Sequence, residues 1–407
     1  ALLFAVLLVS APPAAAQQDV TPDLPSIVEI EASDLAGVVS RYSADREALL
    51  RRWDVAYSSD RRQRLSTFYE GWLRQLDEMD AGRLGLEGRI DYVLLYSELR
   101  YQLQLLERDG RLAAELESLV PFISTIAALQ EARRDLAPVD PREAAVALQD
   151  LAEEVERLRT TLEASLDATE GEATVSSPIV GLRAARAVSS LRRDLEDWYD
   201  HYAGYDPLFT WWAESPYAAV DSSLAGYVDF VRERLVGVEA GGEEPIVGDP
   251  IGADAMRSDL EHEMIAYTPE ELIAIGEREF AWCEAEMVRA SRDMGFGDDW
   301  HAALEHVKTL HVAPGEQPDL VRDLAWEAVA FLQARDLLTI PPLAEEVWRL
   351  EMMSPEMQKI APFFLGGEVI QVSFPTDGMA HEDKLMSMRA NNVHFSRATV
   401  HHELIPG

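Results

Sequence analysis

Apolar residues recur every three or four positions along most of this chain, which is the spacing of one face of an α-helix. Two stretches show this most clearly, with apolar positions at Leu148, Leu151, Val155, Leu158 and Leu162, and at Val188, Leu191, Leu195, Trp198 and Tyr202. Charged residues such as Glu153 and Arg157 fall between the positions of the first stripe. The pattern predicts a mainly α-helical protein whose amphipathic helices bury one face, and it favours core packing over cofactor binding for the aromatic positions.

Caps and proline residues mark several helix boundaries. The segments Asp140–Glu143 and Thr268–Glu271 each combine an N-cap residue, a proline at the first helical position and a glutamate at the third. The pair Ser215-Pro216 predicts a further helix start. Breaks between helices are expected where glycine and proline gather, at 171–178, 204–207, 238–252, 314–318 and 339–342.

One segment near the C-terminus has the pattern of a β-strand instead. Glu368–Phe374 is rich in β-branched residues and alternates weakly, with Gly366-Gly367 before it and Pro375 after it. Short alternating runs bounded by glycine and proline are typical of strands. We therefore expect one strand here, either buried as a structural element or lying at the edge of a sheet.

The first residues resemble an export signal. Residues 1–9 are apolar, and the small residues Ala14, Ala15 and Ala16 follow at an A-x-A site, whereas the charged n-region is missing. The apolar run is about half of the ~20 residues that span a bilayer, which argues against the alternative of a membrane anchor. We interpret residues 1–16 as a signal peptide and 17–30 as a polar tether, and expect a periplasmic or secreted protein without membrane insertion after cleavage.

The chain is strongly acidic, which restricts its partners. Its 36 Lys and Arg against 73 Asp and Glu give a formal net charge of −37. Such a charge repels phosphate backbones, so nucleic acid is not an expected partner. The single cysteine, Cys283, excludes an internal disulfide, and its place on an apolar stripe with Phe280 and Met287 predicts a buried core residue. The sequence carries no signature of oligomeric state.

The dipeptide His402-Glu403 offers the clearest chemistry. In zinc hydrolases a neutral imidazole binds the metal, and a neighbouring carboxylate handles a proton of the metal-bound water. Two other His-Glu pairs, His262-Glu263 and His381-Glu382, have no histidine four positions after the first one. A dipeptide alone is weak evidence, because an ordinary surface pair has the same sequence.

A second cluster has to be weighed against this site. His301, Glu305 and His306 resemble an inverted zinc motif with one residue too many. On a regular helix His301 and His306 do not share a face, since five residues correspond to about 500° of rotation. An ordinary solvated helix is the interpretation that we prefer for this cluster.

The segment Ala398–Gly407 resembles the metal motif of the bacterial domain-of-unknown-function family 885, H-E-x-x-P-G-H. The first, second, fifth and sixth positions of this motif match His402, Glu403, Pro406 and Gly407. Other stretches that are similar to the family are Tyr267–Gly276, Leu338–Pro341, Ala361–Phe363 and Asn391-Asn392. The likeness covers most of the chain and is strongest from about residue 250 onward.

The resemblance implies a zinc-dependent peptidase. The implied fold is mainly α, a large helical zincin-like body with a small β-sheet near the metal helix. His402 would be the first ligand of Zn²⁺ and Glu403 the general base. The second histidine and a later glutamate ligand would lie beyond Gly407, so we expect a C-terminally truncated, inactive fragment here. Residues 31–240 would form an N-terminal helical region, and residues 250–407 the first and incomplete part of the catalytic region.

The strand also acquires a function under this resemblance. An edge strand beside the metal of a peptidase can pair with an extended peptide substrate, and Val369, Gln371 and Ser373 would be the substrate-binding residues. The alternative from another class is a non-catalytic, acidic helical protein of the cell envelope that binds or scaffolds partners. In that case the His-Glu pair would be incidental.

Overall fold

The computed structural model describes residues 33–168, 177–238, 247–361, 366–367 and 369–406. The predicted signal peptide, residues 1–16, and the predicted tether, residues 17–30, lie outside the described residues. So does most of the break predicted at 171–178 and of the one at 238–252.

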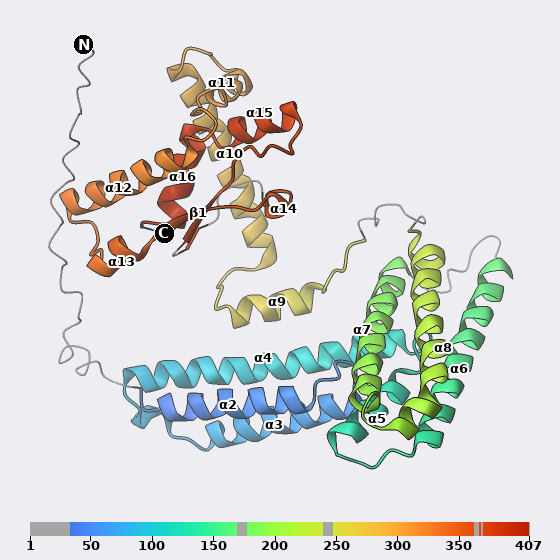
Figure 1. The fold of residues 1–407 in the computed structure, drawn as a ribbon. Coiled ribbons are helices and arrows are strands. Elements are labelled where there is room, and N and C mark those ends of the chain that lie inside the picture. Colours follow the sequence, from blue (N-terminus) through green and yellow to red (C-terminus); the bar gives the residue numbers. More distant parts are fainter. Residues whose placement is uncertain (1–32, 169–176, 239–246, 362–365, 368, 407) are drawn as a thin grey trace, which may run out of the picture. The chain divides into compact units, whose positions relative to one another are not determined.

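The chain divides into two compact units, which we call the N-terminal unit, Ile30–Leu272, and the C-terminal unit, Ile273–Gly407 (Figure 1). Both are mainly helical, as the periodicity predicts. The regions 31–240 and 250–407 inferred from the sequence are a functional division, and they stay a prediction.

The N-terminal unit consists of helices. Their bounds are α2 (Ala36–Arg52), α3 (Ser59–Asp77), η1 (Ala81–Arg83), α4 (Leu86–Leu116), α5 (Ile123–Arg134), α6 (Pro141–Ala168), α7 (Pro178–Tyr202), α8 (Pro207–Val231), η2 (Arg232–Val236) and α9 (Ala253–His262). Figure 1 shows α2, α3 and α4 running side by side, followed by the bundle that contains α6, α7 and α8.

The main core lies inside this bundle. The two stripes found in the sequence are its inner faces, because Leu148, Leu151 and Val155 of α6 and Leu191 and Trp198 of α7 are all at most 1 % exposed. A buried side chain of this size stabilises the folded state by about 1.5–3 kcal/mol relative to an exposed one. The bundle therefore holds most of the apolar burial that fixes the N-terminal unit.

The start of α8 corrects one prediction. Ser215-Pro216 does not begin a helix, because α8 starts at Pro207 with Asp206 as its N-cap and Pro216 lies inside it. The Asp206 carboxylate accepts hydrogen bonds from the amides of Leu208 and Phe209 at 2.9 and 3.1 Å. The prediction was wrong because burial of the α8 apolar face against α6 and α7 outweighs the one backbone hydrogen bond that an internal proline removes.

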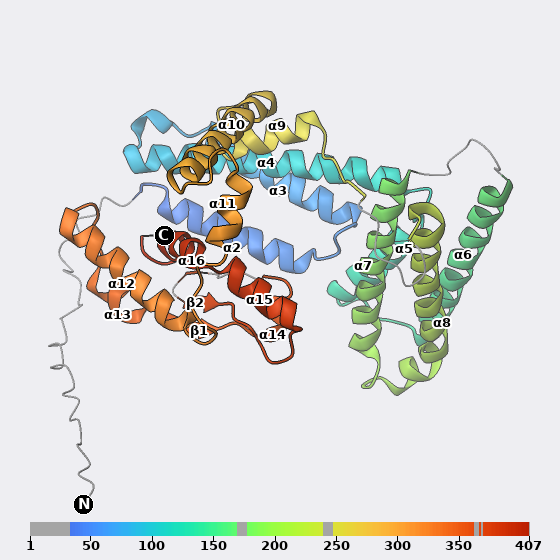
Figure 2. The same cartoon turned by 90° about the horizontal axis from the view of Figure 1, so that it is seen from above.

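The C-terminal unit adds a small sheet to its helices. Its elements are α10 (Pro269–Asp293, which begins at the boundary), α11 (Trp300–Val307), α12 (Gln317–Arg335), α13 (Pro342–Val347), β1 (Arg349–Met352), α14 (Pro355–Gln358), β2 (Val369–Val372), α15 (His381–Ala390) and α16 (Val393–Glu403). The strand predicted at 368–374 is β2, and it pairs in parallel with β1, Arg349 opposite Val369. Ile370 and Val372 of β2 pack with Val400 of α16, so the sheet lies beside the C-terminal helix (Figure 2).

Cys283 contradicts its sequence-based prediction. Its side chain is exposed, as are Ile273 and Phe280 on the same stripe of α10, which are 64 and 67 % exposed. The helix start itself is confirmed, because Thr268 and Glu271 exchange the two hydrogen bonds of a capping box. A 3.6-residue period shows that a helix has one apolar face, but it does not say what covers that face, and this is why the prediction was wrong.

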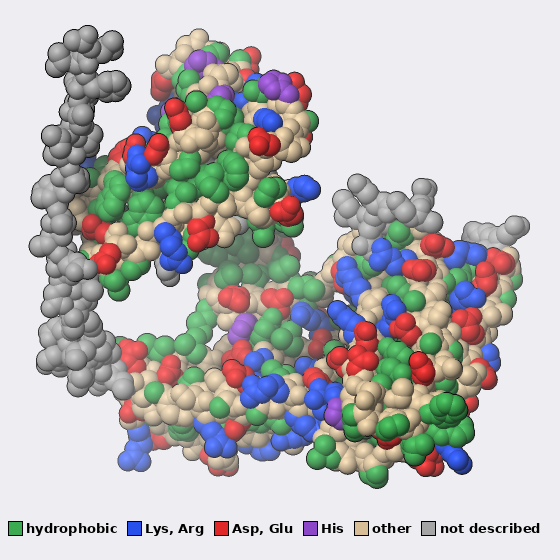
Figure 3. Space-filling view, viewed as in Figure 1, with side chains coloured by type: hydrophobic (Ala, Val, Ile, Leu, Met, Phe, Trp, Pro, Cys, Tyr) green, Lys and Arg blue, Asp and Glu red, His purple; other side chains and the backbone are tan. Residues whose placement is uncertain are grey.

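Acidic side chains are spread over the surface. Figure 3 shows Asp and Glu interspersed with Lys and Arg on the N-terminal unit, and they do not form one block. Exposed pairs of this kind contribute about 0–1 kcal/mol each, so they solvate the surface more than they stabilise it. Among the residues that the structure describes, no helix combines the length and the apolarity needed to cross a bilayer.

Asp194 of α7 makes the stability of the N-terminal unit dependent on pH. Burial, together with the charges of Asp54 and Asp197, raises the pKa of its carboxyl from the ordinary 3.8 to about 6. Its Oδ2 is buried and has no hydrogen-bond partner among the described residues. Between these two values the folded chain binds more protons than the unfolded chain, so stability falls as the pH rises from about 4 to about 6.

Asp194→Asn is therefore expected to leave stability unchanged near pH 4 and to raise it by about 1–2 kcal/mol near pH 8. The figure is discounted for screening, because the carboxyl is partly exposed. Urea unfolding at both pH values measures the difference. Asp200→Asn, an exposed position on the same helix, is the control, and an equal gain at both pH values for Asp194→Asn would contradict the account.

Candidate metal centre

The helix α16 carries the predicted site at its C-terminal end. It starts because the Asn392 side chain accepts hydrogen bonds from the amides of His394 and Phe395, both at 3.1 Å. Ser396, Thr399 and Val400 face the core of the C-terminal unit. This fixes the rotation of the helix.

Removal of this cap is expected to loosen the helix that holds the site. Asn392→Ala should lower the free energy of unfolding of the C-terminal unit by about 1 kcal/mol, since two amides lose their acceptor. Thermal unfolding measures the loss. Asn392→Ser retains a capping oxygen and should stay close to the wild type, so equal losses for both variants would exclude capping as the cause.

His402 is held by its own helix. Its Nδ1 lies 2.9 Å from the carbonyl oxygen of Ala398, and a carbonyl only accepts, so Nδ1 carries a hydrogen. Its Nε2 lies 3.0 Å from Glu403 Oε1, which is also an acceptor when ionised. Nε2 is therefore the nitrogen left to ligate a metal. This is the usual tautomer of a metal-bound histidine, whose other nitrogen binds a carbonyl or a carboxylate.

Glu403 is fixed by a segment far away in the sequence. Its Oε2 accepts a hydrogen bond from the Gly366 amide at 3.1 Å, and its backbone carbonyl accepts one from the Gly367 amide at 2.9 Å. A Cβ on Gly366 would lie 2.2 Å from Glu403 Cβ, so only glycine fits this contact. Because β2 begins at Val369, the contact ties the start of the strand to the His-Glu pair.

The contacts of these two glycines with Glu403 were not predicted from the sequence, in which Gly366-Gly367 marked only the boundary of a strand. The signal that could have found them is the pair itself, because adjacent glycines beside a strand allow close approach of another backbone.

The preceding turn of α16 is joined to α12. Arg397 forms an ion pair with Glu327, and the hydrogen bond from Arg397 lowers the pKa of Glu327. His401 Nε2 is buried and has no hydrogen-bond partner in the described part of the chain. His394 stands eight residues before His402 on the same helix, about 12 Å along its axis, so the structure does not bring these two side chains together.

The donor set fits a zinc site only in part. Zinc in enzymes takes three protein ligands and leaves a fourth position for water or substrate. Nowhere in the described ranges do three or more His, Cys, Asp or Glu side chains gather in a way that could hold a metal ion. The residues present supply one correctly oriented imidazole and one adjacent carboxylate, so the centre needs further ligands.

In the second candidate cluster, on α11, the side chains of His301 and Glu305 contact residues other than a metal site. Glu305 forms ion pairs with Lys308 at 2.6 Å and with Arg389 of α15 at 2.5 Å, and the hydrogen bond from Lys308 is the main reason why its pKa is lowered. His301 stacks on Trp300 with ring centroids 3.6 Å apart. These contacts agree with an ordinary helix whose charges pair at the surface.

The three predicted substrate residues lie on or directly after β2. Val369 and Gln371 are half-buried and alternate with the buried Ile370 and Val372. Ser373 is 2 % exposed, and its hydroxyl donates a hydrogen bond to Gln358 Oε1 at 3.1 Å. A substrate role stays a prediction for all three, and for Ser373 it requires that this hydrogen bond opens.

Comparisons with known proteins identify the family of this chain. No curated protein matches the chain. A solved structure from Shewanella oneidensis, described as a presumed lipoprotein of unknown function, is similar in fold with a TM-score of 0.57 and 13% identity, and covers 92% of this chain and 71% of its own. The model of the family described as bacterial protein of unknown function (DUF885) matches residues 36–407. The chain therefore belongs to the DUF885 family of bacterial proteins.

Proposed function

We propose that this protein acts outside the cytoplasm as a zinc-dependent hydrolase of peptide bonds. The observation that supports the proposal most is the His402-Glu403 pair at the end of α16, with Nδ1 on a backbone carbonyl and Nε2 facing the carboxylate. The signal-like N-terminus and the family resemblance support it further. The similar fold of the lipoprotein-like structure is compatible with a location in the cell envelope.

His402 and Glu403 would have different roles in the reaction. His402 would hold the metal through Nε2, together with the further ligands that the family resemblance implies. When bound, zinc lowers the pKa of its water and polarises the substrate carbonyl. Glu403 would take a proton from the attacking water and pass it to the leaving amine. The amide of Gly366 orients this carboxylate.

The strand β2 would align the substrate. A peptide bound along β2 would lie in an extended conformation and would pass the His-Glu pair near Gly367, where the backbone already contacts Glu403. Val369 and Gln371 would contact alternate side chains of the peptide.

Peptide hydrolysis by the product of the complete gene tests this proposal. A mixture of unstructured peptides should be cleaved, cleavage should stop after treatment with EDTA, and zinc should restore it. Cleavage that is insensitive to EDTA would contradict a metal mechanism. No cleavage by zinc-loaded protein would favour the alternative, an acidic helical binding or scaffold protein.

A further inference from the structure

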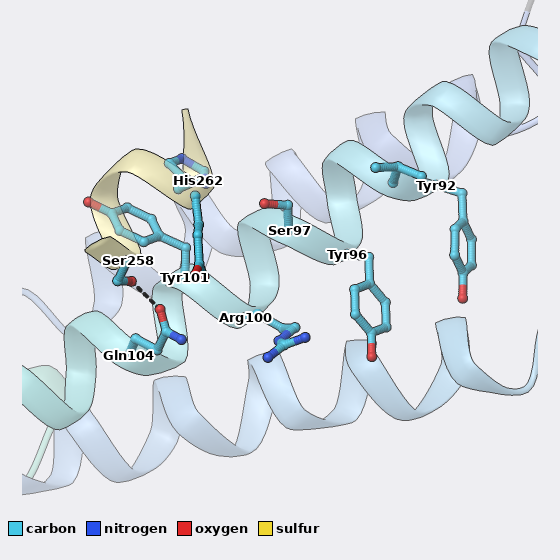
Figure 4. A pocket seen from close by; sticks show the side chains of 10 residues that line it. Tyr92, Tyr96, Ser97, Arg100, Tyr101, Gln104, Ser258 and His262 are labelled. Carbon is cyan, nitrogen blue, oxygen red and sulfur yellow. Dashed lines mark hydrogen bonds between the residues drawn. The ribbon is translucent and has the colours of Figure 1, made fainter. Parts of the chain in front are cut away.

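A groove in the N-terminal unit has no role in the chemistry described so far. It lies where α9 packs on α4, has a volume of about 250 Å³ and is lined by residues of these two helices alone (Figure 4). This is below the roughly 300 Å³ of the smallest drug-sized pockets. The groove is therefore large enough for about one amino-acid residue.

Aromatic rings form much of the lining. Tyr92 and Tyr96 stack with ring centroids 6.0 Å apart and an angle of 22° between the rings. Tyr101 stacks on His262 of α9 at 4.0 Å and 6°. Offset stacking on such rings adds to the stabilisation that another aromatic ring gains from burial. The groove thus favours a flat apolar group.

One cation stands among these rings. Arg100 lines the groove and is exposed, and its guanidinium has no hydrogen bond or ion pair within the described ranges. Arg108, two turns further along α4, is by contrast paired with Asp259 at 3.6 Å. In a chain with 73 acidic and 36 basic residues, a guanidinium without a carboxylate partner is available to an external one, which it can bind through two parallel hydrogen bonds.

Two further polar groups of the lining, both on α9, can contact a ligand. Glu261 is exposed at the groove and can accept a hydrogen bond from an amide N–H. His262 Nε2 lies 3.7 Å from Glu98 Oε2, whereas its Nδ1 is buried and lacks a hydrogen-bond partner among the residues described. A buried ring nitrogen without a partner is costly, and a ligand that reaches it would remove this cost.

We propose that this groove binds an N-acylated aromatic amino acid with a free carboxylate. The aromatic ring lies against the tyrosines, the carboxylate pairs with Arg100, and the amide N–H donates to Glu261. The same chemistry occurs in two sources, the C-terminal aromatic residue of a peptide and a free N-acyl aromatic amino acid. The site lies entirely in the N-terminal unit and does not depend on zinc.

Isothermal titration calorimetry of the 407-residue chain in EDTA tests the proposal. The probes are N-acetyl-L-phenylalanine and N-acetyl-L-phenylalaninamide, which differ only in the carboxylate. The acid should bind saturably and about tenfold or more tightly than the amide, the usual effect of a charge-assisted pair. In Arg100→Gln this preference should disappear, so that both probes bind like the amide.

Arg111→Gln provides the matched control, because Arg111 is exposed on the same helix but outside the groove. It should retain the preference for the acid, and circular dichroism should show equal helix content in both variants. Absence of saturable binding of the acid, or an unchanged preference in Arg100→Gln, overturns the proposal. If the peptide Ala-Ala-Ala-Phe binds more tightly than the acetylated residue, the ligand is a peptide C-terminus, and equal affinities assign it to the free amino acid.

Discussion

Glu403→Gln is expected to lower peptide hydrolysis by the zinc-loaded protein by roughly 100- to 10,000-fold, the range over which a general base contributes. Glutamine keeps the size of the side chain and an oxygen that can accept the hydrogen bond from the Gly366 amide. It cannot take up a proton, so the loss should be in kcat. Zinc content should not change, since His402 still carries the ligating nitrogen.

Glu382→Gln is the matched control for this experiment. Glu382 also follows a histidine, His381, but stands exposed in the first turn of α15. It should retain the activity of the wild type. Activity of Glu403→Gln within about threefold of wild type would remove Glu403 from the proton transfer.

Trp198→Ala is expected to destabilise the N-terminal unit by about 3–5 kcal/mol, because truncation of a buried aromatic side chain loses its burial and leaves a cavity. Trp198 is 1 % exposed and meets Phe209 of α8 edge to face, with ring centroids 5.5 Å apart. Guanidinium chloride unfolding followed by circular dichroism measures the loss.

Trp211→Ala controls for the chemical change alone. Trp211 lies on α8 and is 79 % exposed, so the same truncation should change stability by less than about 0.5 kcal/mol. Similar losses for the two variants would show that the bundle core is not where the structure places it.

The helices of the core were predictable because their signal is local. The stripe at Leu148, Leu151 and Val155 repeats with the period of a helix, and in the structure this apolar face is buried in the bundle core. The cap Thr268–Glu271 was predictable for the same reason, since both of its hydrogen bonds join residues three apart.

Features that depend on distant residues were not predictable in this way. β1, Arg349–Met352, is a mostly exposed strand without an apolar alternation, and it exists because β2 pairs with it across the intervening chain. The helix start expected at Ser215-Pro216 and the burial expected of Cys283 were wrong because both depend on what packs against the helix.

The candidate site also has one part that the local sequence predicts and one part that depends on distant residues. His402 and Glu403 could be found from the sequence because their neighbourhood on one helix is itself the motif. The contacts of Glu403 with Gly366 and Gly367 join positions more than thirty residues apart, and no local pattern specifies them. The groove between α4 and α9 could not be predicted from the sequence for the same reason. Its residues Tyr101 and His262 are far apart in the sequence and come into contact only in the folded chain.

The zinc content of the purified protein decides whether His402 holds a metal ion. Elemental analysis of the purified protein and of His402→Gln should be compared, with His381→Gln as the control on an exposed histidine. About one zinc per chain is expected in the wild type and in His381→Gln, and most of it should be lost in His402→Gln. Wild-type protein without zinc after equilibration with the metal, or equal zinc in all three proteins, would contradict it.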